Sequence, residues 1–275
     1  MKTFIRWSGN KSKYLKYIHP HIPTTFNTYI EPFIGSGAVF LYVKPDKWII
    51  NDLNKDLIHV WKSIKTSQDE IINLIKKIKK QFEPLSKPNK AAYCKDILHD
   101  LPTMPYNILR ATTYIVVKYC AYMGNIFIKG KYYFPGLDLS LHADRPIYFL
   151  SEKFFANLQQ VHNHLRSTKG QIFNKDYKYI LNKAVKGDFV FLDPPYIEDN
   201  NYQFNYNKNE ILDDKFISDL SIELKVLDKR GVKWLMTQAD NDVIRKTFKK
   251  YKIIPFPICR GYTNTNKNEL IIKNY

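Results

Sequence analysis

Residues 193–196 of this 275-residue chain are Asp-Pro-Pro-Tyr, and they follow the apolar run 189–192. At the end of a buried strand, Asp193 and the Pro194 carbonyl would each accept one N–H of an amino group on a planar ring. Pro195 would stiffen the turn, and Tyr196 would stack on the ring. An ordinary strand-to-loop turn uses the same residue types, so this motif alone leaves both interpretations open.

A second motif lies near the amino terminus and has the form of a ligand-binding turn. A short strand at residues 29–30 leads to Gly35-Ser36-Gly37 and then to an apolar stretch of helical character. In an α/β sheet the first strand-to-helix turn must let the backbone approach a ligand, and glycine permits this because it lacks Cβ. The dinucleotide fingerprint requires a third glycine where this chain has Phe40, so NAD binding is disfavoured.

An acid follows the second predicted strand, residues 48–50, and this acid is Asp52. A carboxylate at that place can accept hydrogen bonds from ribose hydroxyls. The ordered set of a glycine turn, Asp52 and Asp193 is much harder to obtain by accident than any one of its members.

Taken together, these motifs resemble the DNA adenine N6-methyltransferases of the Dam type, the D12 class or alpha group. The resemblance covers nearly the whole chain in the family's own order. It is carried by Trp-Ser-Gly-Asn-Lys at 7–11, Glu-Pro-Phe-Ile-Gly-Ser-Gly at 31–37, Asn-Asp-Leu-Asn at 51–54, Asp-Tyr at 176–177, Gly-Asp-Phe-Val at 187–190 before Asp193, and Lys-Asn-Glu-Leu-Ile-Ile at 267–272. Asn10 departs from the family, which usually has glycine there.

The family resemblance implies an α/β fold, a Rossmann-like class I S-adenosylmethionine-dependent methyltransferase sheet. Residues 1–66 and 150–275 would form the catalytic domain, and residues 67–149 an inserted, mostly helical target-recognition domain with a β-hairpin. The sequence pattern agrees, because strands and helices alternate at both ends of the chain. Between them, prolines and glycines separate a helical stretch at 106–123 from short aromatic runs.

The implied reaction moves a methyl group from S-adenosylmethionine to the exocyclic N6 of an adenine flipped out of double-stranded DNA, without a metal. Asp193, Pro194, Pro195 and Tyr196 would form the catalytic motif. Phe33 would lie against the cofactor adenine, and Lys11 near its carboxylate. The cofactor-binding residues implied in this way are Trp7, Ser8, Gly9, Lys11, Glu31, Pro32, Phe33, Gly35, Gly37, Asp52, Asp176, Tyr177 and Asp193.

Polar side chains of the insert are the candidates for reading bases. The predicted DNA-binding residues are Arg110, Asn125, Lys129, Lys131 and Arg145. Residues 133–138 differ from the Phe-Asn-Val-Pro-Tyr-Gly hairpin of the GATC-methylating members, so the target sequence stays open. The alternative is a hairpin that only packs on the sheet, with target recognition by residues 199–210.

The composition agrees with an intracellular protein that meets nucleic acid. The 43 Lys and Arg residues exceed the 26 Asp and Glu residues, for a formal net charge of +17. Such an excess commonly meets phosphate, although a lysine-rich solvated surface would give the same balance. Three widely spaced cysteines form neither a disulfide framework nor a zinc pattern. With no signal peptide and no membrane-spanning run, a cytoplasmic or other intracellular soluble location is expected.

Other functions stay open at this point. The same Asp-Pro-Pro-Tyr device would serve a methyltransferase that acts on RNA adenine or on a protein glutamine amide. A non-catalytic DNA-binding relic is a third alternative, although intact Asp52 and Asp193 argue against it. A restriction endonuclease is a candidate partner, and the sequence does not fix the recognition site, the biological role or the oligomeric state.

Overall fold

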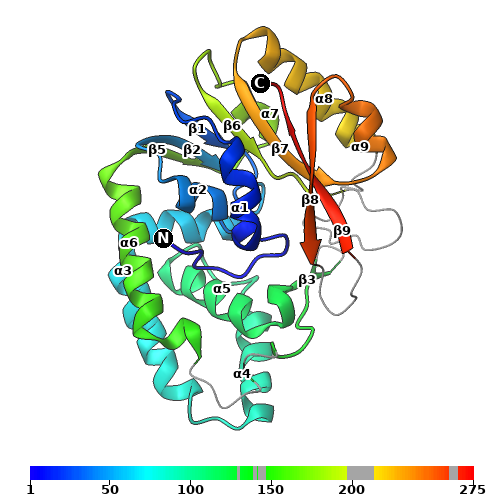
Figure 1. Ribbon diagram of the computed structural model, residues 1–275. Coiled ribbons are helices and arrows are strands. Elements are labelled where there is room, and N and C mark those ends of the chain that lie inside the picture. The colour runs from blue at the N-terminus through cyan, green and yellow to red at the C-terminus, as the bar shows by residue number, and fades with distance from the viewer. Residues whose placement is uncertain (129–130, 139–140, 142–146, 197–213, 260–265) are drawn as a thin grey trace.

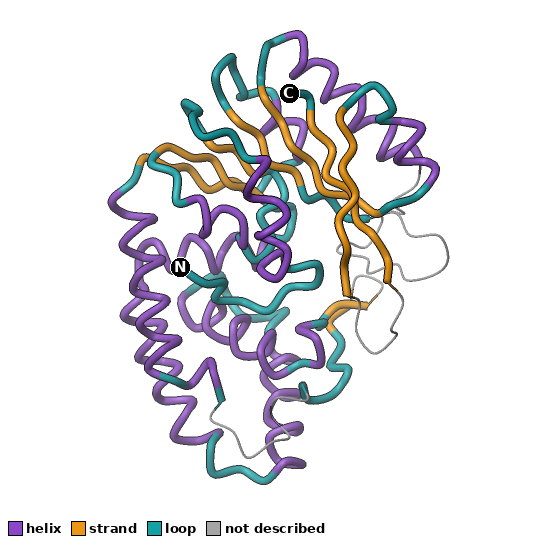
Figure 2. Tube along the Cα trace, in the orientation of Figure 1, coloured by secondary structure: helices purple, strands orange, loops and turns teal. Residues whose placement is uncertain are grey.

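A seven-stranded sheet forms the upper half of the molecule (Figures 1 and 2). The computed structural model describes residues 1–128, 131–138, 141, 147–196, 214–259 and 266–275. In spatial order the strands are β5 (Lys169–Phe173), β2 (Lys47–Asn51), β1 (Tyr29–Glu31), β6 (Phe189–Leu192), β7 (Lys233–Ala239), β9 (Asn266–Lys273) and β8 (Lys252–Cys259).

The strand order confirms the predicted Rossmann-like methyltransferase sheet. β5, β2, β1, β6 and β7 pair in parallel, whereas β9 runs antiparallel to both β7 and β8. The order in which the chain adds strands reverses at β1, whose two neighbours are β2 and β6. Ligands bind outside the carboxyl ends of parallel strands at such a reversal, so the motifs after β1, β2 and β6 meet at one edge.

Strands β1 and β6 are buried on both faces, which is why they appear as short apolar runs in the sequence. Tyr29 and Phe189 face a core shared with α2 (Ala38–Val43), whereas Ile30 and Val190 face a second core. The helices that bury the second face are α7 (Tyr177–Leu181), α8 (Asp214–Lys229) and α9 (Asp242–Thr247). Gly231, with φ of +69°, ends α8, and the Val232 N–H donates back to the Leu227 carbonyl at 3.1 Å.

The chain between β2 and β5 forms the helical lower half in Figures 1 and 2. The long helix α3 (Lys55–Phe82) leaves helical geometry at Ser67, where φ is −140° and ψ is 41°. The hairpin is present as well, with Phe127 opposite Tyr132. The elements of this half are α3 (Lys55–Phe82), α4 (Lys87–Asp100), α5 (Ile108–Cys120), η3 (Tyr122–Gly124), β3 (Phe127–Ile128), β4 (Lys131–Tyr132), η5 (Tyr148–Leu150) and α6 (Glu152–Ser167).

The hydrophobic core continues from the sheet into this lower half without interruption. Phe191 of β6, Trp61 of α3 and Val117 of α5 belong to the same cluster of buried side chains. The N-terminal segment joins the cluster through Phe4. It is followed by the short elements η1 (Lys11–Tyr14), α1 (Leu15–Ile18) and η2 (His19–His21). None of the helices in the described ranges is both long and apolar enough to cross a membrane.

Candidate active site

The turn after β1 is closely packed and requires glycine at two positions. Gly35 and Gly37 have φ of +46° and +69°. A Cβ on Gly35 would lie 2.9 Å from the indole of Trp7, and one on Gly37 would lie 2.5 Å from Trp61. The turn therefore brings bare backbone against Trp7, one of the residues predicted to bind the cofactor.

Asp52 holds this turn from the neighbouring strand. Its Oδ2 accepts the Gly35 N–H at 3.0 Å, and its Oδ1 accepts the Asn54 N–H at 2.9 Å. Burial raises the pKa of Asp52 to about 6, although the backbone donors oppose that rise. The structure thus joins Asp52 to the glycine turn at the edge where a ribose was predicted.

Asn51 has a structural role that sequence reasoning missed. Its Nδ2 donates to the carbonyls of Pro32 and Lys175, both at 2.9 Å. Its Oδ1 accepts the Lys175 N–H at 2.9 Å. One buried amide therefore connects the ends of β1, β2 and β5, and the only sequence signal was a polar side chain at a strand end.

Glu31 lies beneath the turn rather than at its surface. Its carboxylate accepts the Tyr29 hydroxyl at 2.6 Å and also the backbone N–H of Phe40. Burial raises the pKa of Glu31 well above its usual range. The side chain therefore ties β1 to α2, which supports the predicted cofactor turn from below.

Three aromatic rings cluster beside this edge. The ring centroids of Phe33 and Tyr177 lie 5.4 Å apart, and Phe216 of α8 lies 6.5 Å from Phe33 and 5.6 Å from Tyr177. Asp176 caps α7 by accepting the Lys178 N–H at 2.8 Å. The cluster brings together the residues predicted to contact a cofactor adenine and adds Phe216, which no sequence motif had indicated.

Asp193 is fixed through one of its two carboxylate oxygens. Oδ1 accepts the Thr237 hydroxyl at 2.7 Å and lies 2.8 Å from the Lys11 amine and 3.3 Å from the Tyr196 hydroxyl. Oδ2 has no hydrogen-bond partner in the part of the chain that the structure describes. The carboxylate is therefore oriented and still has an open acceptor.

Tyr196 and Lys11 converge on a second buried acid, Glu269 of β9. The Tyr196 hydroxyl donates to Glu269 at 3.0 Å, and the Lys11 amine lies 4.0 Å from the same carboxylate. The amine also donates to the Gly9 carbonyl at 2.9 Å. Burial holds the pKa of Tyr196 well above its usual range, so this hydroxyl stays a donor.

The Lys11 amine lies within 4.0 Å of the carboxylates of both Asp193 and Glu269. Thr237 and Glu269 were not predicted as site residues. Glu269 lies within the closing motif of the sequence, whereas nothing in the sequence marked Thr237.

A lysine from α5 also reaches this edge. Lys118 is only 5% exposed, and its amine lies 4.4 Å from the ring centroid of Trp7. Asp52 is the acid whose charge acts on it. No ligand motif in the sequence pointed to Lys118, which is 66 residues away from Asp52 in the chain.

The structure describes three of the five residues predicted to contact DNA. Arg110 is 4% exposed, pairs with Asp56 at 2.6 Å and donates to the carbonyls of Leu101 and Met104. This burial contradicts the base-contacting position predicted for Arg110. Asn125 is half-buried after η3, and Lys131 lies in β4. Lys129 and Arg145 fall outside the described residues.

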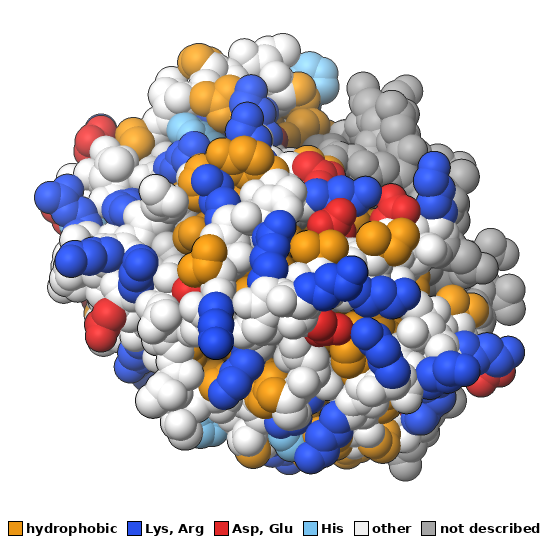
Figure 3. Space-filling view, turned by 90° about the horizontal axis from the view of Figure 1, so that it is seen from above, with side chains coloured by type: hydrophobic (Ala, Val, Ile, Leu, Met, Phe, Trp, Pro, Cys, Tyr) orange, Lys and Arg blue, Asp and Glu red, His pale blue; other side chains and the backbone are white. Residues whose placement is uncertain are grey.

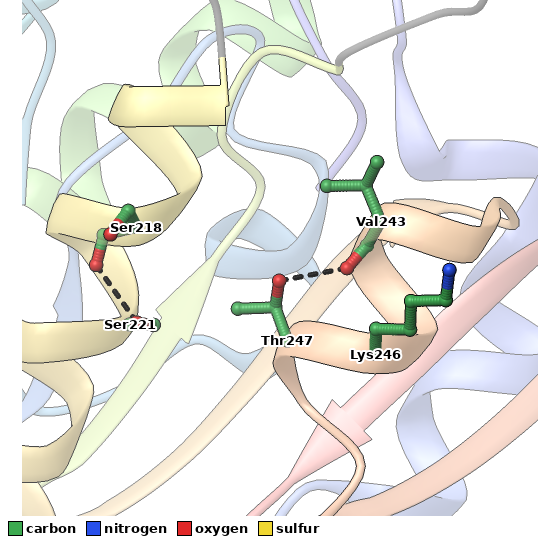
Figure 4. Close-up of a pocket in the computed structure, with 5 residues that line it drawn as sticks. All are labelled: Ser218, Ser221, Val243, Lys246 and Thr247. Carbon is green, nitrogen blue, oxygen red and sulfur yellow. Dashed lines mark hydrogen bonds between the residues drawn. The ribbon is translucent and has the colours of Figure 1, made fainter.

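One pocket in the structure lies away from these residues, between α8 and α9 (Figure 4). Its hydroxyl groups are committed to the backbone of their own helices: Ser221 donates to the Ser218 carbonyl and Thr247 to that of Val243. Lys246 also lines it. None of its five described lining residues belongs to the predicted catalytic or cofactor-binding set. The described residues also contain no group of three or more potential metal ligands.

Comparisons with known proteins extend over most of the chain. The family model for the D12 class N6 adenine-specific DNA methyltransferase matches residues 7–256. The Type II methyltransferase M1.LlaDCHI of Lactococcus lactis subsp. cremoris is 24% identical over 100% of this chain and 96% of its own length. M.MjaIII of Methanocaldococcus jannaschii is 26% identical over 100% and 99%, and the DNA adenine methylase of Serratia marcescens 25% over 89% and 86%.

Proposed function

This chain belongs to the D12 class of N6 adenine-specific DNA methyltransferases, and we propose that Asp193 Oδ2 and the Pro194 carbonyl accept the two N–H groups of the target adenine. The family uses S-adenosylmethionine, whose sulfonium supplies an electrophilic methyl group. The amine of adenine is a poor nucleophile because its lone pair is delocalised into the ring. Two acceptors on its hydrogens counter that delocalisation and aim the nitrogen at the methyl group.

The arrangement around Asp193 carries this proposal. Thr237 and Lys11 hold Oδ1, so Oδ2 points in one direction and remains available as an acceptor. Glu269 holds the Tyr196 hydroxyl, which orients that ring to stack on a flipped base.

The residues also fit the cofactor. Asp52 offers a carboxylate to ribose hydroxyls, and the rings of Phe33 and Tyr177 offer an apolar face to its adenine. The Gly35 turn packs closely against Trp7, another of the residues predicted to bind the cofactor. These are roles for side chains that the sequence had indicated, now gathered at one edge of the sheet.

The direct test follows methyl transfer from labelled S-adenosylmethionine to adenine-containing DNA. We expect Asp193→Ala to abolish transfer while the variant still folds and binds DNA. Asp240→Asn is a matched control, because Asp240 forms a surface ion pair with Arg245. Transfer by Asp193→Ala at near the normal rate would show that another group orients the amine. Parallel RNA and protein substrates should stay unlabelled.

Target reading is proposed for the insert, residues 67–149. Figure 3 shows lysine and arginine side chains scattered over the described part of one face, among uncharged side chains and a few acidic ones, so charge alone does not locate the DNA. Asn125 and Lys131 follow α5 in and beside the hairpin, and Lys129 and Arg145 complete the candidates. A base-reading side chain contributes about 1–3 kcal/mol at one position, whereas a phosphate contact weakens all sequences alike.

The proposal that the insert reads the target sequence can be tested separately from catalysis. Sequencing of methylated adenines across a genome should show a relaxed motif for Asn125→Ala or Lys131→Ala. An unchanged motif in every active insert variant would favour recognition by residues 199–210.

We also propose an intracellular location and a restriction endonuclease as partner. If a nuclease gene lies beside this gene, deletion of the methyltransferase gene alone should lead to cleavage of the cell's own unmethylated DNA.

A further inference from the structure

Lys118 is a buried cation that the proposed reaction does not use. It projects from α5, and its amine lies over the Trp7 ring at 4.4 Å. None of the ion pairs formed among the described residues includes it. Placing an ammonium in the interior is costly, so a buried lysine without a bonded acid needs an explanation.

The charged groups around Lys118 leave it with one partial counter-charge. Asp52, after β2, favours its protonated form, but both Asp52 oxygens already accept backbone N–H groups. Arg6, from the N-terminal segment beside Trp7, is itself in an ion pair with Asp138. Burial lowers the pKa of Lys118 to about 7, so its charge is poorly compensated in the free protein.

The orientation expected for the cofactor brings its carboxylate end toward Lys118. Phe33 and Tyr177 mark the adenine end, and Asp193 marks the sulfonium. The carboxylate end then extends along the Gly35 turn, whose backbone contacts Trp7. Lys118 lies on that indole.

Lys11, which the sequence suggested for the carboxylate, is committed elsewhere. Its amine is held by Asp193 at 2.8 Å and by the Gly9 carbonyl at 2.9 Å. An amine engaged in this way would have to abandon the catalytic carboxylate in order to bind the cofactor. The two lysines therefore have separate partners.

We propose that the Lys118 amine binds the carboxylate of S-adenosylmethionine, so that α5 of the insert completes the cofactor site. The inference rests on the proposed function. In this arrangement α5, which leads directly into η3 and the hairpin, contacts the cofactor. Cofactor binding is thereby linked to the insert proposed to read DNA.

The proposal predicts uptake of a proton. At pH 8 the amine of the free protein is mostly neutral, whereas the bound carboxylate favours its charged form. Titration calorimetry of S-adenosylmethionine at pH 8, in two buffers of different ionisation enthalpy, should therefore show proton uptake by the wild-type protein. The uptake should shrink at pH 6, where Lys118 is already protonated.

Variants separate a contact from a packing role. Lys118→Met keeps the length of the side chain and should weaken binding by about 10-fold or more while abolishing the uptake. Lys118→Arg keeps a permanent charge, so it should retain most affinity without uptake. Lys65→Met is the control, because Lys65 also lies over an indole, Trp48 at 5.2 Å, away from the site.

Decarboxylated S-adenosylmethionine completes the test. It should bind the wild-type protein more weakly and lose nothing further in Lys118→Met. Equal losses for both ligands in that variant would show a packing role and overturn the proposal, as would unchanged affinity and uptake. Absence of any binding by the wild-type protein would instead overturn the cofactor site as a whole.

Discussion

The amine of Lys11 lies 2.8 Å from Oδ1 of Asp193, and this ion pair joins the N-terminal segment to the end of β6. Lys11 is 4% exposed, so the pair is shielded from solvent. Glu269 lies 4.0 Å from the same amine. Lys11 thus holds Oδ1 of Asp193 and leaves the other carboxylate oxygen free to act as an acceptor.

Lys11→Met should lower the single-turnover rate of methyl transfer by about 10-fold or more. Without the ammonium, Asp193 Oδ1 loses its partner at 2.8 Å, and a hydrogen bond to a charged group contributes about 1.5–3 kcal/mol. The rates should be measured at saturating S-adenosylmethionine, so that a change in cofactor affinity does not enter them. Lys13→Met, an exposed neighbour, should leave the rate unchanged. A normal rate in Lys11→Met would show that Asp193 is oriented without this ion pair.

Thr237→Val should lower the transfer rate by about 10-fold, with the KM for S-adenosylmethionine unchanged. The fully buried hydroxyl is a short donor to Asp193 Oδ1, and one such bond contributes about 1.5 kcal/mol. Valine keeps the volume but removes the donor. Thr237→Ser should restore most of the rate. If serine and valine behave alike, the side chain matters for packing rather than for orienting Asp193.

The sequence anticipated those parts of the site that are local in the chain. Asp193 and Gly35 each lie directly after an apolar strand, so a short motif specifies both the residue and its place at the sheet edge. β1 and β6 were recognisable because strands buried on both faces are continuous apolar runs. Asp52 was predicted in the same way, because it follows the second predicted strand.

The residues that were missed come from elements distant in sequence. Thr237 and Glu269 reach Asp193 and Tyr196 because β7 and β9 are neighbours in the sheet, although they are not consecutive in the chain. Lys118 depends on how α5 packs, and nothing in a helical pattern shows which lysine faces inward. Arg110 was misplaced for the same reason, because its partner Asp56 is 54 residues away.

Arg110→Met should therefore destabilise the protein instead of changing its target sequence. Loss of the guanidinium would leave Asp56 buried with the Tyr132 hydroxyl as its remaining side-chain partner, and breaking a buried pair costs about 3–5 kcal/mol. Thermal unfolding should show a clear drop in Tm, while residual activity keeps the wild-type motif. Arg245→Met, at an exposed pair, is the control and should change Tm little. A normal Tm with a relaxed motif would return Arg110 to the DNA interface.

The affinity for S-adenosylmethionine should have a bell-shaped dependence on pH. Burial raises the pKa of Asp52 to about 6, so the ionised acceptor for the ribose is lost as pH falls through 6. Burial lowers the pKa of Lys118 to about 7, so the cation for the carboxylate is lost as pH rises through 7. Calorimetry from pH 5 to pH 9 should place the tightest binding between these values.

The two limbs of this profile should respond to different substitutions. Asp52→Asn should flatten the acid limb, and Lys118→Met should flatten the alkaline limb. Because the Lys118 charge lowers the pKa of Asp52, its removal should also move the acid limb of Lys118→Met to higher pH. That displacement distinguishes two coupled groups from two independent ones. An alkaline limb that persists in Lys118→Met would assign it to another group and exclude Lys118 from the carboxylate site.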